Sequence, residues 1–365
     1  MVSLSSSSSR KLEISIIGGG LIGPRHAKSV NLNPHATLHS LVDPASHGVS
    51  TAASLGTTYF CSIDDLLAST PLPDAAIVCT PNSTHVTLSL QLIAAGVHVL
   101  VEKPIATSLD SGRKLIKAAL EANIKLLVGH HRRFNPYLVA AKKSLEAKSL
   151  GDVIAVQGIW ANRKASDYFD GIGEWRRNAE SGGVVLINLV HEIDLLQYML
   201  GPIEYISAMP AKKTRGFAAE EGAAINLRFA SGAIGSFILS DTVPSPWNFE
   251  AGTGENPMIP KVLAASNAGG FYRIMGTQGS LSVPDLTLWH YDNARSGGSW
   301  TDTLIVEELE VQQDQVPFDL QVQHLVDVVQ NGAQPSCSGE DALRAMVVCD
   351  AVKVAMATGQ AVEIS

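Results

Sequence analysis

The stretch "SIIGGGLIG", residues 15–23, places a glycine-rich turn directly after a short apolar strand. Its glycines have the spacing G-x-G-x-x-G, and a helical run begins at about Arg25. Glycine at these points permits a tight turn, a close approach of backbone N–H groups to a pyrophosphate, and close packing of helix on strand. The turn therefore predicts a Rossmann dinucleotide-binding site. The residues predicted to line it are Gly18, Gly20, Leu21, Ile22 and Gly23.

A second apolar strand ends at Asp43, twenty residues after Gly23. A carboxylate in this place can accept hydrogen bonds from the ribose 2′- and 3′-hydroxyls, and it would repel a 2′-phosphate. No arginine follows Asp43 closely. The pattern predicts NAD as the cofactor, in preference to NADP. A glycine turn that binds no ligand is the alternative, and the flanking strand, the helix and Asp43 argue against it.

Strand and helix alternate from Leu12 to about residue 129, which predicts a doubly wound parallel sheet. Three longer segments, "DVIAVQGIWA", "GAAINLRFA" and "GAIGSFILSD", then predict an α+β domain with an open, mainly antiparallel sheet. The predicted divisions are a disordered tail (1–11), a Rossmann domain (12–129) and a substrate-binding and oligomerisation domain (130–365). Because an open sheet needs its second face covered, we expect a homodimer or homotetramer.

The composition excludes several classes of partner. The 365 residues carry a formal charge of −8, whereas nucleic acids and anionic membranes attract a basic surface. The four cysteines are scattered without a C-x-x-C pair, which predicts free thiols in a reducing compartment. The serine-rich start has no apolar segment typical of a signal peptide. The sequence contains no apolar run of 18 residues, so we expect no membrane span. We therefore expect a cytoplasmic protein without a nucleic-acid or membrane partner.

Two further strands end on polar side chains. "CTPNSTH", residues 79–85, follows the third strand, and Thr80, Asn82 and His85 there could contact a ligand, cap the next helix, or do both. "GVHVLVEKPIATS", residues 96–108, ends a buried strand on Glu102 and Lys103. Ligands of α/β sheets bind at the carboxyl ends of the strands, so this lysine is a candidate chemical group.

The segment "GGVVLINLVHEIDLLQYMLG", residues 182–201, predicts an amphipathic helix. Residues three apart share a helix face, so Asn188 and His191 can point together and His191 can meet Asp194. A zinc-protease motif H-E-x-x-H fails, because Leu195 stands where the second histidine is needed, and we expect no metal. Taken alone, His191 fits a histidine of the core or the surface as well as a catalytic one.

Six stretches together resemble, in order, the motifs of the glucose-fructose oxidoreductase/inositol dehydrogenase/rhizopine-catabolism (Gfo/Idh/MocA) family. They are "GGGLIGPRHA", "CTPNSTH", "AGVHVLVEKPI", "VGHHRRFNP", "WRRNAESGGVVLINLVHEID" and "YRIMGTQGSL". The resemblance covers the chain from about Leu12 to Ile364, and its most specific parts are the E-K-P element and the G-G…H-x-x-D helix. It implies a two-domain, NAD(P)-dependent oxidoreductase.

The resemblance also implies roles for single residues. Lys103 would reach the nicotinamide and hydrogen-bond the reacting oxygen, Glu102 would help to fix its loop, and the following proline is often cis in this family. His191 matches the histidine that takes or gives the hydroxyl proton. Beyond the glycine turn, the predicted cofactor-binding residues are Asp43, Thr80, Asn82, His85, Glu102, Lys103 and Arg133. The predicted substrate-binding residues are Lys164, Tyr168, Trp175, Arg176, Asn188 and Asp194.

One position departs from the family pattern. The family usually has an aspartate four residues before the histidine, but Ile187 stands there and Asn188 stands three before it. An amide cannot accept a proton, so we expect Asn188 to hydrogen-bond a substrate hydroxyl instead. For Lys164 and Tyr168, exposed loop residues without a ligand are the alternative.

These observations predict hydride transfer between nicotinamide and a secondary alcohol or ketone of a sugar, a polyol or a related cyclic polyhydroxy compound. Lys103 and His191 would be the catalytic residues. A non-catalytic NAD-binding regulator of the same fold is one alternative, although it would need neither proton-transfer group. A reductase of a ketone or imine is the other.

Overall fold

The computed structural model describes residues 10–256, 259, 270–292, 298–312 and 314–364. The chain divides into two compact units, which we call unit 1 (residues 1–134 and 315–343) and unit 2 (residues 135–314 and 344–365). Most of the tail predicted at 1–11 lies outside the described residues. Arg10, within that stretch, hydrogen-bonds Asp74 through its guanidinium and Gln330 through its carbonyl oxygen.

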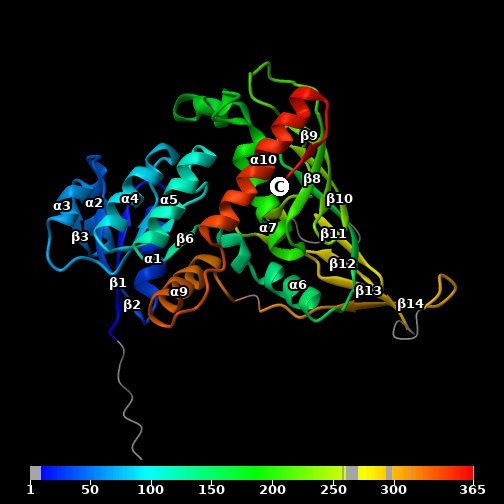
Figure 1. Cartoon of the computed structure of the whole chain (residues 1–365), viewed down its shortest axis with the longest axis horizontal. Helices are drawn as coiled ribbons and strands as arrows, with labels where there is room; N and C mark the ends of the chain where they lie inside the picture. The colour runs from blue at the N-terminus through cyan, green and yellow to red at the C-terminus, as the bar shows by residue number, and fades with distance from the viewer. Residues whose placement is uncertain (1–9, 257–258, 260–269, 293–297, 313, 365) are drawn as a thin grey trace, which may run out of the picture. The chain divides into compact units, whose positions relative to one another are not determined.

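Unit 1 contains the predicted parallel sheet, whose strand order is β3-β2-β1-β4-β5-β6 (Figure 1). The strands are β1 (Leu12–Ile17), β2 (Ala36–Val42), β3 (Thr58–Phe60), β4 (Ala75–Val78), β5 (His98–Val101) and β6 (Leu126–Val128). The four residues of β4 are all buried, as expected for a parallel strand that is covered on both faces. The order reverses between β1 and β4, which is the place where open α/β sheets bind ligands.

Helices cover both faces of this sheet. They are α1 (Gly23–Leu32), α2 (His47–Leu55), α3 (Ile63–Leu67), α4 (His85–Ala94), α5 (Leu109–Glu121) and α9 (Pro317–Gln330), with short 3₁₀ turns η1 (Asn82–Thr84) and η2 (His131–Phe134). Side chains of α1, α2 and α9 form one apolar core with the sheet. Right-handed crossovers place α4 and α5 on the opposite face, because the strand order runs the other way after β1.

Helix α9 shows where the predicted domain boundary differs from the structure. The sequence predicts one domain for residues 130–365, but residues 315–343 belong to unit 1. Phe318 on α9 is buried, packs edge-on against the ring of His26, and lies 3.9 Å below the guanidinium of Arg25. Packing on α1, about 290 residues earlier in the chain, therefore decides the membership of α9.

Unit 2 contains a nine-stranded sheet in the order β14-β13-β12-β11-β7-β10-β9-β8-β15. The strands are β7 (Val153–Ala161), β8 (Ile203–Pro210), β9 (Gly222–Phe229), β10 (Ile234–Ser240), β11 (Tyr272–Gly276), β12 (Ser280–Val283), β13 (Thr287–Tyr291), β14 (Leu304–Glu308) and β15 (Val362–Glu363). Strands β7 and β10 pair in parallel and the other described neighbours are antiparallel, which confirms the predicted open, mainly antiparallel sheet.

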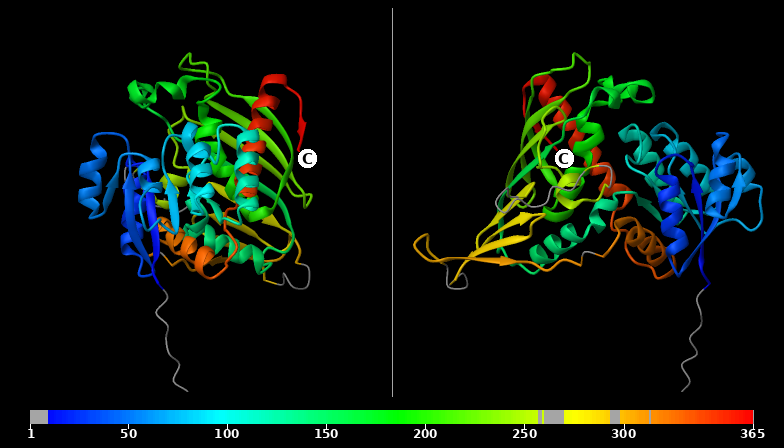
Figure 2. Two further views of the ribbon diagram at one scale, coloured as in Figure 1. Left: turned by 60° about the vertical axis from the view of Figure 1, so that its left-hand side comes forward. Right: turned by 180° about the vertical axis from the view of Figure 1, so that it is seen from behind.

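The helices of unit 2 cover one face of this sheet (Figure 2). They are α6 (Pro136–Glu146), α7 (Val190–Leu200), α8 (Phe249–Thr253) and α10 (Gly339–Thr358), which belongs to unit 2 from residue 344 onwards. The 3₁₀ turns η3 (Ser166–Phe169) and η4 (Gly171–Arg177) and the π-helical turn η5 (Val185–Leu189) also belong to this unit. Side chains of α6, α7 and α10 share one core with the inward residues of the strands. On the other face, Met209, Ile234, Ile238 and Met275 expose between 38% and 68% of their surface.

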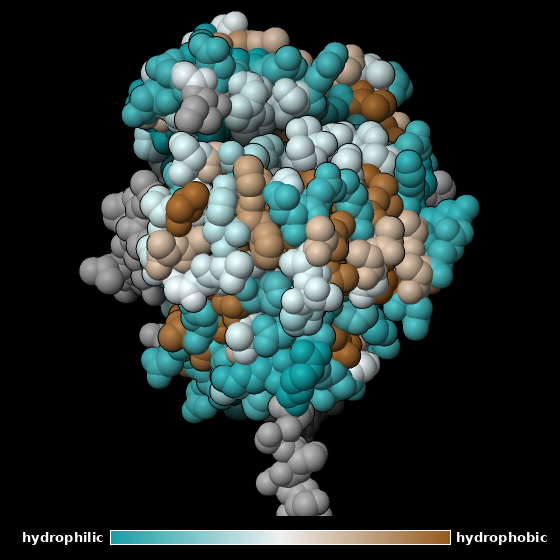
Figure 3. Space-filling model, turned by 90° about the vertical axis from the view of Figure 1, so that its left-hand side faces the viewer, coloured by the Kyte–Doolittle hydropathy of each residue, from teal (hydrophilic) through white to brown (hydrophobic). Residues whose placement is uncertain are grey.

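In the part of the chain that the structure describes, no helix is both long and apolar enough to span a bilayer. On the face drawn in Figure 3, apolar residues are scattered among hydrophilic ones. The four cysteines are free thiols, and Cys61 is the exposed one.

Candidate active site

The glycine turn after β1 leaves no space for side chains at two of its positions. A Cβ on Gly18, whose φ is +106°, would lie 2.9 Å from the carbonyl carbon of Cys79, and a Cβ on Gly23 would lie 1.9 Å from the carbonyl oxygen of Gly18. A Cβ on Gly20 would meet no atom within 4 Å, and Leu21 is 87% exposed. The turn is thus closed towards the sheet and open on its outer side, where a dinucleotide can approach the backbone.

Helix α1 begins directly after this turn without a polar cap. Its N-cap residue is Ile22, whose side chain cannot accept a hydrogen bond, and Pro24 stands in the first turn. The first N–H groups of a helix need external partners, and together with the helix dipole they favour an anion. This helix start therefore fits the pyrophosphate of a dinucleotide.

Asp43 connects the glycine turn to the end of β2. One carboxylate oxygen accepts a hydrogen bond from the Gly19 N–H at 2.6 Å, and the other accepts one from the Ala45 N–H at 2.7 Å. Each oxygen retains a second lone pair, so the carboxylate can still accept a ribose hydroxyl. The structure thus adds a structural role to the predicted one: Asp43 holds the turn in shape.

The side chains of the "CTPNSTH" stretch make contacts other than the predicted helix cap and ligand contact. Asn82 is exposed, and the Thr84 hydroxyl donates to the Thr80 hydroxyl at 2.8 Å instead of capping α4. His85 is buried, and both of its ring nitrogens lie within hydrogen-bond distance of backbone carbonyl oxygens, those of Thr80 and Pro104. Its ring is therefore committed to the chain, which argues against the predicted direct contact with a cofactor.

The E-K-P element follows β5, and its Lys103–Pro104 peptide bond is cis, as the resemblance implied. Glu102 is buried: one carboxylate oxygen lies 2.8 Å from Nε2 of His26 on α1, and the other accepts the Lys103 N–H at 3.1 Å. Glu102 thus holds the backbone of Lys103, as expected. The Lys103 side chain is half-buried at the carboxyl edge of the sheet.

The charge of Glu102 is maintained by its neighbours. Burial by itself raises the pKa of this carboxyl, but the hydrogen bond from His26 and the charges of His26, His131 and Lys103 outweigh burial and lower the pKa to about 2. Glu102 is therefore a permanent anion at neutral pH. Sequence reasoning missed His26, although it stands three residues into the helix of the glycine motif.

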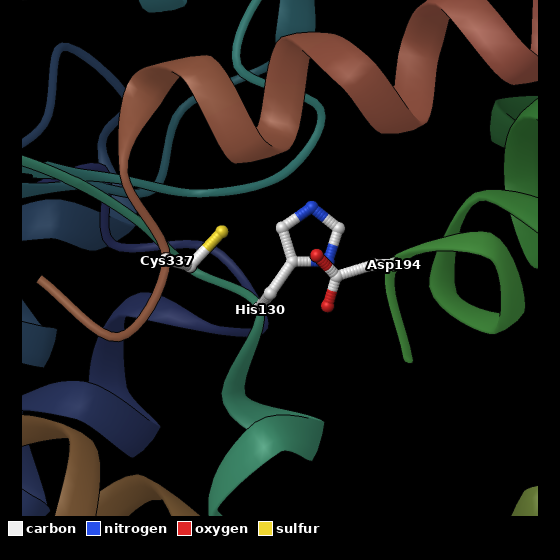
Figure 4. Close-up of side chains that lie close together, drawn as sticks. All are labelled: His130, Asp194 and Cys337. Carbon is white, nitrogen blue, oxygen red and sulfur yellow. The ribbon is translucent and has the colours of Figure 1, made fainter. Parts of the chain in front are cut away.

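The turn η2 lies at the end of β6, next to the segment that precedes α10. Arg133 donates to the carbonyl oxygen of Ser336 and lies 3.6 Å from the carboxylate of Asp341, so these contacts connect η2 to the chain around the start of α10. The contact of Arg133 with a cofactor stays a prediction. His130 and the thiol of Cys337 lie within 4.8 Å of each other (Figure 4). The figure also draws Asp194, which belongs to unit 2.

In unit 2, His191 is the second residue of helix α7, which directly follows the π-helical turn η5 that contains Asn188. Single π-helical turns are common at functional sites because they change the direction in which side chains point. Asn188, His191 and Asp194 are all buried. The predicted single amphipathic helix over 182–201 was wrong in two respects: the helix is π-helical at its start, and α7 is buried on nearly all sides because it lies in the core of unit 2.

A buried polar bond sets the orientation of α7. The hydroxyl of Tyr272 on β11 donates a short hydrogen bond to the carboxylate of Glu192, and both residues are fully buried. Glu192 follows His191, so this bond fixes the rotation of the helix next to His191. In the sequence, Glu192 stands out only within the failed zinc motif, and no local pattern indicates this contact, because its partner is 80 residues away.

Four predicted substrate-binding residues of unit 2 form one cluster. The guanidinium of Arg176 lies 4.0 Å from the ring centre of Tyr168 and 5.3 Å from that of Trp175, and the ammonium of Lys164 lies 4.9 Å from the Tyr168 ring. Burial raises the pKa of the Tyr168 hydroxyl, the charge of Arg176 opposes this, and Asp241 and Glu250 add to it. Lys164 and Tyr168 are thus half-buried cluster members and not freely solvated loop residues.

Comparison with protein families confirms the resemblance drawn from the motifs. The model of the oxidoreductase family with an NAD-binding Rossmann fold matches residues 12–130, and the model of its C-terminal alpha/beta domain matches residues 142–364. The chain belongs to the Gfo/Idh/MocA oxidoreductases. A member of this family is an enzyme of oxidation and reduction, and its first unit is an NAD-binding domain, as predicted.

Similar proteins extend along nearly the whole chain. Inositol 2-dehydrogenase of Rhizobium meliloti (strain 1021) is 24% identical over 364 residues, covering 96% of this chain and 98% of that protein. The scyllo-inositol 2-dehydrogenase (NAD(+)) of Bacillus subtilis (strain 168) is 26% identical over 339 residues, covering 91% and 90%. An oxidoreductase from Agrobacterium radiobacter, crystallised with NAD+, L-tartaric acid and magnesium, has a TM-score of 0.79 over 97% of this chain and 98% of that one, at 18% identity, which confirms the fold.

The pKa of Glu102 leads to a prediction about stability. Because the folded-state pKa of about 2 lies below the ordinary 4.5, ionised Glu102 stabilises the fold above pH 4.5, and this stabilisation is lost as the pH falls towards 2. The difference corresponds to roughly 3 kcal/mol in the free energy of unfolding at neutral pH. We expect the Glu102→Gln protein to be less stable at neutral pH and to lose less stability on acidification, measured by urea unfolding at a series of pH values.

Glu121→Gln is the matched control, because Glu121 is an exposed carboxylate at the end of α5. This variant should follow the unmodified protein at every pH. A Glu102→Gln protein with an unchanged pH dependence would show that the bond with His26 does not stabilise the fold.

Proposed function

We propose that the protein catalyses NAD-dependent oxidation of a secondary alcohol of a cyclic or open-chain polyhydroxy compound, with Lys103 and His191 as the catalytic residues. The observation that carries the proposal is the E-K-P lysine, whose backbone is fastened by an ionised Glu102 at the ligand-binding edge of an NAD-binding sheet. The similarity to two inositol 2-dehydrogenases supports a polyol as the substrate class.

Bound NAD would supply the hydride acceptor, and the side chains of this chain would manage the proton. The Lys103 ammonium would donate a hydrogen bond to the reacting oxygen, which stabilises negative charge as it develops there. The His191 imidazole would accept the hydroxyl proton as the carbinol carbon loses its hydride. The same residues would act in reverse if the physiological reaction reduces a ketone.

The polyhydroxy class also agrees with the polar groups of unit 2. Lys164 and Arg176 supply cationic donors beside the ring of Tyr168, and Asn188 supplies a neutral amide close to His191 in sequence. Hydroxyl groups are both donors and acceptors, so a polyol suits a mixed set of this kind. We propose that Lys164, Tyr168, Trp175, Arg176, Asn188 and Asp194 bind the substrate.

Replacement of the two catalytic residues tests the proposal. Lys103→Met and His191→Phe should each leave the NAD dissociation constant nearly unchanged and lower turnover on the true polyol by on the order of 10²–10⁴-fold. Because both residues would serve one proton transfer, the double variant should lose much less than the product of the single losses. The measurements are calorimetry for NAD and absorbance of reduced nicotinamide for turnover, with a panel of polyols, aldoses and cyclic acids.

Asn188→Ala serves as the contrasting variant. An amide can orient a hydroxyl but cannot carry its proton, so this change should raise the Michaelis constant more than it lowers turnover. Near-normal turnover by a folded, NAD-binding His191→Phe protein would exclude His191 as the base. Binding of NAD without turnover on any tested compound would favour a non-catalytic regulator.

We also propose that NAD is preferred over NADP. Asp43 keeps an anionic carboxylate beside the glycine turn, and this charge would repel a 2′-phosphate. Calorimetry should show clearly tighter binding of NAD than of NADP, and Asp43→Ser should narrow the difference. Because Asp43 also binds the Gly19 N–H, Asp43→Asn is a useful companion variant: it loses the negative charge but keeps one carbonyl acceptor. Equal or tighter binding of NADP by the unmodified protein would contradict the prediction.

We further propose that a second copy of the chain covers the exposed face of the unit 2 sheet. Three neighbouring strands present Met209, Ala224 and Ile238 in one row of that face, and Ile234 stands two rows away, beyond a polar row that contains Ser236. Burial of such apolar rows provides the free energy for association.

The formal charge of −8 and the free thiols support the further proposal of a cytoplasmic protein without nucleic-acid or membrane partners.

The oligomer can be tested by size-exclusion chromatography with light scattering. The unmodified chain should elute as a dimer or a larger assembly, and Ile238→Glu should weaken it by placing a charge in the apolar row. Leu120→Glu is the control, since Leu120 is an even more exposed apolar residue, on α5 of unit 1. A stable monomer at micromolar concentration would show that the face stays open.

A further inference from the structure

The ring of His85 makes two contacts of the same kind. Its Nε2 lies 2.8 Å from the carbonyl oxygen of Thr80, and its Nδ1 lies 2.9 Å from the carbonyl oxygen of Pro104. The residue is 1% exposed, so water does not compete for either nitrogen. Thr80 follows β4 and Pro104 follows the neighbouring strand β5, and the ring therefore connects the two loops at the ends of these strands.

Carbonyl oxygens can only accept hydrogen bonds. A neutral imidazole has one N–H donor and one nitrogen with a lone pair, so it can satisfy only one of the two carbonyls and would direct its lone pair at the other. Two hydrogen bonds require a hydrogen on both nitrogens, which is the imidazolium. A cationic donor also makes stronger hydrogen bonds than a neutral one.

The bridge ends next to the reactive lysine. Pro104 is bonded directly to Lys103, whose own N–H is held by the carboxylate of Glu102. The lysine is thus fastened on both sides, by Glu102 before it and by His85 after it. The ionisable groups at the ends of these two strands are Cys79 after β4 and Glu102 and Lys103 after β5, and His26 pairs with Glu102. Helix α5, which packs against α4, carries Asp110, Arg113, Lys114, Lys117 and Glu121.

We propose that His85 is a positioning residue, a doubly protonated imidazole that joins the Thr80 and Pro104 carbonyls and thereby holds Lys103 in place for hydride transfer. The role of Lys103 in this statement rests on the proposed function. The bridge between the two carbonyls does not rest on the proposed function. The bridge and the positioning of Lys103 are therefore tested by separate experiments.

The first experiment examines the bridge in the protein without cofactor or substrate. The protein is prepared with isotope-labelled histidine, and nuclear magnetic resonance reads the protonation of each ring nitrogen at neutral pH. The signals of His85 are assigned by their loss in His85→Gln or, if that variant does not fold, in His85→Phe. Two protonated nitrogens on His85 are expected. One unprotonated nitrogen would overturn the double bridge.

The second experiment measures the loop and the reaction. His85→Phe keeps a ring but has no donor, whereas His85→Gln keeps an amide donor. Amide hydrogen exchange of residues 99–108 should increase in the order unmodified protein, His85→Gln, His85→Phe. Turnover should fall in the same order, by on the order of 10- to 100-fold for His85→Phe, because a small displacement of a catalytic group has effects of this size. The NAD dissociation constant and the Michaelis constant should change little.

His39→Gln is the matched control, because His39 on β2 also contacts a proline carbonyl oxygen, that of Pro71 at 3.2 Å. It should change neither the exchange of residues 99–108 nor turnover. Unchanged exchange in both His85 variants would overturn the proposal. Increased exchange with normal turnover would keep the bridge but refute the positioning of Lys103. If Lys103→Met itself retains turnover, the proposed function fails. The magnetic resonance and hydrogen-exchange results would still show whether His85 bridges the two carbonyls.

Discussion

Burial on both faces confines the polar side chains of the parallel sheet to the ends of its strands. The residues of β4 are buried throughout, and β5 is buried from Val99 onwards, so neither strand can present a charged group to water along its length. Asp43, Thr80 and Glu102 all stand at carboxyl ends, within two residues of the last residue of β2, β4 and β5 respectively. The parallel arrangement brings these ends to one edge, and the chemistry of unit 1 is therefore concentrated there.

The polar groups at this edge are held mainly by the backbone. Asp43 accepts two backbone N–H groups, His85 contacts two backbone carbonyls, and Glu102 accepts the N–H of Lys103. Such bonds restrict the loops without occupying the Lys103 side chain. The three anchors thus prepare the edge for a ligand, and the glycine turn contributes an open side and an uncapped helix start to the same edge.

In unit 2, a hydrogen bond between two buried side chains, rather than bonds to the backbone, orients the polar residues. Its helix α7 is surrounded by apolar side chains, which by themselves specify no unique rotation. The buried bond from Tyr272 to Glu192 favours one rotation, because a rotated helix would break this hydrogen bond to a buried carboxylate. The π-helical turn before His191 then sets how Asn188 is presented relative to the α-helical residues that follow.

The sequence by itself determined the parallel sheet, the glycine turn, the E-K-P strand end, the open second sheet and the family, because each depends on residues that are close together in the chain or on a local hydrophobic period. It also contained an unused signal for α9, in the helical spacing of Phe318, Val322, Leu325 and Val326 after Pro317. Only the tertiary structure decided that α9 belongs to unit 1, that Glu102 pairs with His26, that Glu192 is bound by Tyr272, and that His85 is committed to two carbonyls. These contacts join residues between 5 and about 290 positions apart in the chain, on elements whose packing brings them together. Local patterns carry no information about such partners, because a buried polar group is satisfied by whatever the fold places beside it.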